Sequence, residues 1–105
     1  MKLYIIVRND LSHGLQASQA LHAGQLFQAT HKDLTKKWML KSNRVVILQV
    51  PNATELEKTF ELASNEKLKA CRFDDEDLFP TLGAIAIEPT RRAQHFCRDF
   101  PLAFQ

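Results

Sequence analysis

Cysteine and long apolar stretches are both scarce in this sequence. It contains only two cysteines, Cys71 and Cys97, which lie far apart and form no CxxC motif. This excludes a disulfide framework and favours a reducing compartment. The apolar run at residues 3–7 is too short for a signal peptide or a bilayer span, and no other segment is long enough. We therefore expect a cytoplasmic protein without a membrane anchor.

Internal repeats, low-complexity tracts and linkers are also lacking. The 105 residues, with 45% apolar and 25% charged side chains, are typical of one soluble globular domain spanning 1–105. A chain of this length buries one core but not two. Its net charge of +2 permits an RNA or phosphate partner without requiring one.

Strand-like and helical segments alternate along the chain. Apolar runs predict four strands, and helical spacing predicts two clear helices, the second capped by Asn52 or Thr54. The tail after Pro89 begins as a helix that Pro101 ends, and residues 31–43 fit either a short helix or an ordered loop. The predicted strands span residues 3–7, 44–50, 68–73 and 82–89, and the clear helices span residues 15–30 and 52–67.

This alternation predicts an α/β fold with a mixed, mostly parallel four-stranded sheet. Only about eight residues separate the third and fourth predicted strands, which leaves no room for a crossover helix. We therefore expect that pair to be antiparallel.

The helix predicted at residues 15–30 has two different sides. One side carries mostly small residues that let the helix approach a sheet closely, namely Ala17, Ala20, Leu21, Gly24 and Phe27. The opposite side carries Leu15, Ser18, Gln19, His22 and Leu26. On spacing alone, His22 is an ordinary surface histidine. The alternative is a base or water-orienting imidazole, because ligands of α/β sheets bind beyond the carboxyl ends of strands.

Several short motifs occur in a characteristic order. They are LYIIVRNDL, QASQALHAG, VVILQVPN, TELEKTFELA and CRFDDEDLFPTLGAIAIEP. In this order, over residues 3–89, the chain resembles the archaeal and eukaryotic type of peptidyl-tRNA hydrolase. The last segment is similar to a bacterial or phage-like branch of that family. The resemblance implies a three-layer α/β/α fold and hydrolysis of the ester that joins a peptide to the tRNA 3′ end. It implies no metal and no organic cofactor.

The resemblance also implies site residues. His22 matches the motif histidine and Gln19 its neighbouring glutamine, while Asp77 and Thr81 match the acid and hydroxyl of the acidic loop. In a rival alignment, Asp74 or Asp75 takes the acidic place. Leu15 departs from the family pattern, which usually has a lysine there. That difference favours a second hypothesis, a non-catalytic member of the fold that binds RNA or protein.

The basic segment around residues 32–44 is the best candidate for tRNA binding. Its lysines would contact phosphates, and Trp38 would stack on an unpaired base. The alternative is a solvated connection whose Trp38 packs on the core. If these charges were buried or dispersed, a small-molecule-binding α/β domain of other ancestry would be favoured. The lysines are Lys32, Lys36, Lys37 and Lys41.

The Phe-rich tail allows two interpretations. Phe96, Phe100 and Phe104 recur every four residues, which fits a segment covering a face of the sheet. The alternative is the surface of a homodimer.

Overall fold

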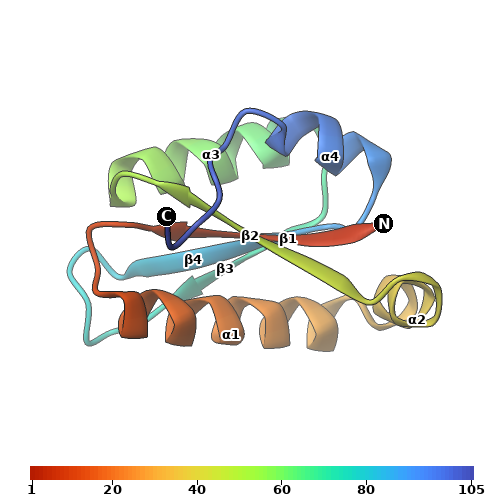
Figure 1. Cartoon of the computed structure of the whole chain (residues 1–105), viewed down its shortest axis with the longest axis horizontal. Coiled ribbons are helices and arrows are strands. Elements are labelled where there is room, and N and C mark those ends of the chain that lie inside the picture. Colours follow the sequence, from red (N-terminus) through yellow and green to blue (C-terminus); the bar gives the residue numbers. More distant parts are fainter.

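The computed structural model describes all 105 residues and has the expected element order (Figure 1). No helix has the length and apolar character that crossing a membrane requires. Of the two alternatives for residues 31–43, the short helix is confirmed, and the third strand begins and ends later than expected. The elements are β1 (Lys2–Arg8), α1 (His13–Thr30), α2 (Lys32–Lys41), β2 (Arg44–Val50), α3 (Ala53–Asn65), β3 (Ala70–Asp74), β4 (Leu82–Ile87) and α4 (Arg91–Cys97).

The sheet has the strand order β2-β1-β4-β3. Only β1 and β2 pair in parallel, so the prediction of a mostly parallel sheet was wrong. The expected antiparallel pairing of β3 with β4 is confirmed. The short β3–β4 loop (residues 75–81) reverses the chain, and β4 then lies between β3 and β1. Strand β4 pairs antiparallel with both of these neighbours.

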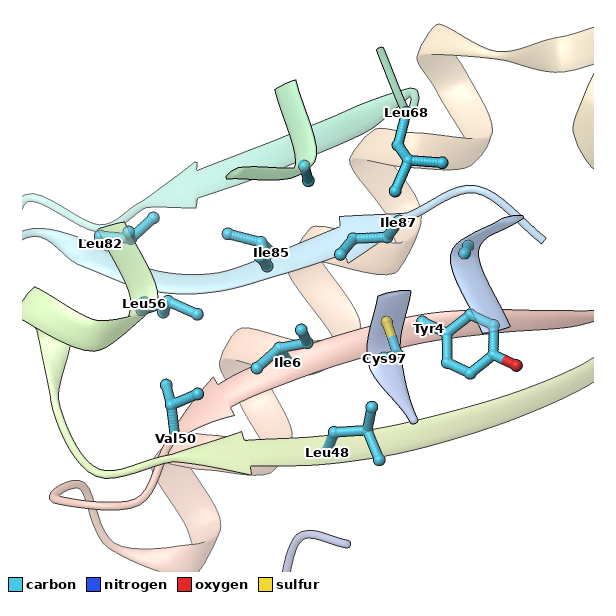
Figure 2. Packing of buried hydrophobic residues seen from close by; sticks show 12 residues of the cluster. Tyr4, Ile6, Leu48, Val50, Leu56, Leu68, Leu82, Ile85, Ile87 and Cys97 are labelled. Carbon is cyan, nitrogen blue, oxygen red and sulfur yellow. The ribbon is translucent and has the colours of Figure 1, made fainter. Parts of the chain in front are cut away.

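Helices cover both faces of the sheet, α1 and α2 on one and α3 and α4 on the other (Figure 1). Along β1, Leu3, Ile5 and Val7 point to the α1 face, whereas Tyr4 and Ile6 point to the α3–α4 face. This alternation follows from the two-residue period of a strand. Figure 2 shows the hydrophobic core on the α3–α4 face, where strand side chains meet Leu56 of α3 and Cys97 of α4.

Helix α1 begins where the Ser12 hydroxyl accepts a hydrogen bond from the Leu15 amide. Its close approach to the sheet is confirmed for Ala20, Gly24 and Phe27, and a Cβ on Gly24 would lie 3.7 Å from Ile5 Cδ1. The prediction for Ala17 and Leu21 is wrong, because both are exposed. The buried face is rotated, so it also includes Ala23 and two glutamines, Gln16 and Gln19.

Trp38 of α2 belongs to the core. Its side chain is 3% exposed, and its indole Nε1–H donates to the Arg44 carbonyl oxygen at 2.8 Å. The indole therefore has no free face for a base, which corrects the expectation of stacking. The four lysines of α2 are all exposed.

The C-terminal tail packs within its own chain. Phe96 and Phe100 contact the core between the sheet and the α3–α4 layer. Beyond them the tail follows the edge of β2, where the Ala103 amide donates to the Ile47 carbonyl oxygen at 2.9 Å. Phe104 lies against the His13 ring. The homodimer stays a prediction.

Candidate functional site

His22 lies on the outer surface of α1, beside β3. Its ring stacks on Phe73 with 4.6 Å between ring centroids and 15° between ring planes. Its side chain is exposed, and its position is set by this stacking. A base needs a ring nitrogen that solvent or substrate can reach, and an exposed, stacked imidazole meets that requirement.

Gln19, one turn before His22, connects the helix to the β3–β4 loop. Its side chain is only 1% exposed, and its Nε2 donates to Asp75 Oδ2 at 2.9 Å. The other Asp75 oxygen accepts the Asp77 backbone amide at 2.9 Å. The Asp77 amide, the Gln19 amide and the nearby charge of His22 together hold the pKa of Asp75 below its usual range. Asp75 is therefore an ionised carboxylate at neutral pH.

Gly83 of β4 provides the space that Gln19 occupies. A Cβ at position 83 would lie 2.0 Å from Gln19 Oε1 and 2.6 Å from Gln19 Cδ. Any residue with a Cβ at this position would displace the Gln19 side chain. The hydrogen bond between Gln19 of α1 and Asp75 therefore requires glycine at position 83.

The structure separates the four residues that the sequence grouped together. Gln19 and His22 lie with Asp75, so the geometry favours this rival carboxylate over Asp77, which supplies only its backbone amide. The Thr81 hydroxyl instead donates to Asp74 Oδ1 at 2.9 Å.

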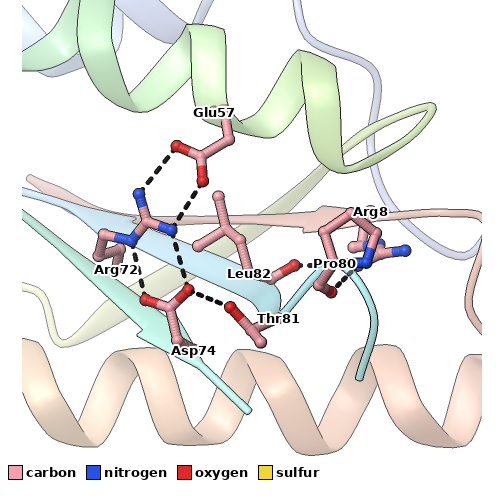
Figure 3. Close-up of polar contacts among 7 residues, drawn as sticks. All are labelled: Arg8, Glu57, Arg72, Asp74, Pro80, Thr81 and Leu82. Carbon is pink, nitrogen blue, oxygen red and sulfur yellow. Dashed lines mark hydrogen bonds and ion pairs between the residues drawn. The ribbon is translucent and has the colours of Figure 1, made fainter. Parts of the chain in front are cut away.

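Asp74 and Thr81 belong to a separate ionic network. The Arg72 guanidinium bridges Asp74 and Glu57 of α3, with four nitrogen–oxygen distances of 2.7–2.9 Å (Figure 3). Thr81 hydrogen-bonds to this network. Its hydroxyl donates to Asp74, so this hydrogen bond joins the two ends of the β3–β4 loop.

Arg8, which the sequence did not single out, holds the other end of the loop. Its side chain is 4% exposed and pairs with Asp10 through two 2.8 Å hydrogen bonds. Figure 3 shows its guanidinium beside the Pro80 carbonyl oxygen, to which it donates at 2.7 Å. It also donates to the Leu82 carbonyl oxygen at 3.2 Å. An arginine at the end of a strand, followed by Asn and Asp, gives no sequence signal for such a contact, because its partners are distant backbone carbonyls.

The ion pairs at this site predict a loss of stability in acid. Hydrogen bonds from Arg8 and Arg72 lower the pKa of Asp10 and Asp74, respectively. A carboxylate with a lowered folded-state pKa stabilises the fold above its unfolded pKa of about 3.9, and this contribution disappears as pH falls through the folded value. We expect the Tm to fall steadily below about pH 4 in thermal unfolding experiments.

Asp10→Asn provides the matched comparison. The variant should have a lower Tm at pH 7 and a shallower acid dependence than the wild type, because it has one ion pair fewer to lose. Both pairs are partly exposed, so each effect should be about 1 kcal/mol or less. An acid dependence identical to that of the wild type would contradict this assignment.

Residues 1–102 match the family described as peptidyl-tRNA hydrolase PTH2. A comparison with curated proteins finds no match. The expected bacterial or phage-like branch stays a prediction. Because the family match covers nearly all of the sequence, other ancestry is excluded, and the chain belongs to the peptidyl-tRNA hydrolase PTH2 family.

Proposed function

We propose that this protein hydrolyses the ester of peptidyl-tRNA, with His22, Gln19 and Asp75 at its catalytic site. Family membership implies the reaction. The observation that supports the site is the 2.9 Å hydrogen bond from buried Gln19 to Asp75, next to the exposed ring of His22. This hydrogen bond joins α1 to the acidic β3–β4 loop. The sequence alone did not show which acid of that loop lies next to α1.

In the proposed reaction, His22 takes a proton from water as the water oxygen attacks the ester carbonyl carbon. The tetrahedral intermediate then breaks its bond to the tRNA 3′ oxygen, which leaves with that proton as a free hydroxyl. The charge of Asp75 stabilises the imidazolium formed in the first step. Gln19 positions Asp75, because its amide proton is already engaged with that carboxylate.

The exposed lysines of α2, at positions 32, 36, 37 and 41, are proposed to contact tRNA phosphates. They lie beside the C-terminal end of α1, away from the acidic β3–β4 loop (Figure 1). Phosphate contacts of this kind depend strongly on salt.

A comparison of two carboxylate variants tests the site. Purified wild-type protein should release peptide from N-acylated aminoacyl-tRNA. Asp75→Asn should lower kcat at least about tenfold, because it removes the charge beside His22. Asp77→Asn should remain near the wild type, because Asp75 uses only its backbone amide. Absence of release at high wild-type concentration contradicts the function, and a larger defect in Asp77→Asn contradicts the site.

One observation favours the alternative, a non-catalytic RNA- or protein-binding member of the fold. Leu15 lies two turns before His22 on the same side of α1 and is 43% exposed, where the family pattern has a cation. Retained tRNA binding without any peptide release by the wild type would support this alternative.

A further inference from the structure

Unpaired cations gather at one end of the molecule. The chain has 14 Lys and Arg residues, and only Arg8, Lys58, Arg72 and Arg98 form ion pairs, which leaves ten unpaired. The sheet register brings Lys2 opposite Arg44 at the start of the parallel pair. Lys69 lies at the same end of the sheet, because its carbonyl oxygen accepts the amide of Glu88 just after β4.

These charges extend around the end of the sheet from the α2 side to the α4 side. Ser42, which follows α2, hydrogen-bonds to the Met1 carbonyl oxygen and so ties α2 to the start of β1. A hollow then connects Lys2 with Arg91, and a second hollow continues along α4 from Arg91 to Arg98. Figure 1 places α2, the N-terminus and the beginning of α4 at this end. We name the exposed cations of α2 together with Lys2, Arg44 and Arg91 the basic end.

Counter-charges at the basic end are few. Asp33 lies in the first turn of α2, and Glu88 is buried, where it accepts from the Lys69 amide and the Thr90 hydroxyl. Glu66, whose carbonyl oxygen accepts a hydrogen bond from Arg92 of α4, is a further exposed acid beside this end. Most other acids lie on α3 or in the run from Asp74 to Asp77. Unpaired like charges held close together repel one another, and a polyanion with regularly spaced charges relieves that repulsion.

We propose that the basic end binds an RNA phosphate backbone continuously, so that the RNA contacts the α4 side and the N-terminus as well as α2. This inference rests on the proposed function for the identity of the RNA as tRNA. The phosphate contacts carry no base specificity. The body of the tRNA would lie at the basic end, away from the acidic loop, and only its 3′ end would reach along α1 to His22.

Charge reversals on the two sides test this proposal. Binding of deacylated tRNA should be measured over a range of salt concentrations for Arg91→Glu, Lys37→Glu and the double variant. Each single reversal should reduce the slope of log affinity against log salt by about 0.9, and the double variant by about twice that amount. Arg91→Glu places a negative charge in the first turn of α4, where an acid is favourable, so folding should be preserved.

Lys58→Glu is the matched control, because it makes the same charge change on the exposed surface of α3. It should keep the wild-type slope. If Arg91→Glu behaves like Lys58→Glu, the RNA contacts only α2 and the proposal is wrong; the same holds if the wild type does not bind tRNA. Peptide release by the wild type, measured separately, reports on the proposed function independently of these slopes.

Discussion

Replacing His22 with Ala should lower kcat for peptidyl-tRNA hydrolysis by about 10²–10⁴-fold, the usual contribution of a positioned general base. The exposed ring stacks on Phe73, with 4.6 Å between ring centroids. Its loss should therefore change the Tm little. The rate of peptide release under single-turnover conditions measures the effect on the chemical step directly.

A second variant separates proton transfer from packing. His22→Phe keeps an aromatic ring on Phe73 but has no nitrogen to accept a proton. We expect it to be as inactive as His22→Ala. His13→Ala is the control, because it removes another exposed α1 histidine, one that packs against Phe104. If His22→Phe kept wild-type activity, His22 would have a packing role only, and the catalytic assignment would be wrong.

Gly83→Ala should disconnect α1 from the acidic loop. The new Cβ would meet Gln19 Oε1 at 2.0 Å, and the atoms in its way are the flexible end of the glutamine. We therefore expect the side chain to swing away while β4 stays in place, at a stability cost of about 1–3 kcal/mol. Without its hydrogen bond to Gln19, Asp75 should be less well positioned, and kcat should fall by up to about 10²-fold.

The Asp75 carboxylate provides a readout that does not depend on activity. The Gln19 hydrogen bond is one of the causes that lower its pKa, so that pKa should rise in Gly83→Ala, as measured by NMR titration of the carboxyl carbon. Gly14→Ala is the matched control, because a Cβ there meets nothing within 4 Å. It should leave the rate and the Asp75 titration unchanged.

A double variant completes the comparison. Gln19→Ala combined with Gly83→Ala removes the steric conflict, so stability should recover relative to Gly83→Ala while activity should not. Recovery of activity would show that Gln19 has no positioning role.

The local structure of this chain was largely predictable from its sequence. Apolar runs located the four strands, Asn52 caps α3 as predicted, and the short β3–β4 loop required an antiparallel pair. These features depend on residues that are near neighbours in the chain. Family membership was predictable for a related reason, because ordered short motifs survive in the linear sequence.

The environments of Trp38 and of the acidic loop were not predictable from the sequence. A tryptophan in a basic segment fits a nucleic-acid surface as well as a core, and only the position of α2 against the sheet buried it. Four consecutive acids offer several alignments, and only the folded loop directs Asp75 to Gln19 and Asp74 to Arg72.

The sequence by itself therefore determined the four strands, the two long helices and the family, because each of these depends on residue type and local spacing. The tertiary structure decided that β4 lies between β1 and β3, that Gly83 makes room for Gln19, and that Arg8 holds the β3–β4 loop. Each of these depends on contacts between segments distant in the chain. Steric fit and hydrogen-bond geometry decide such contacts, and neither can be read from a short stretch of sequence, because the two partners come together only in the folded chain.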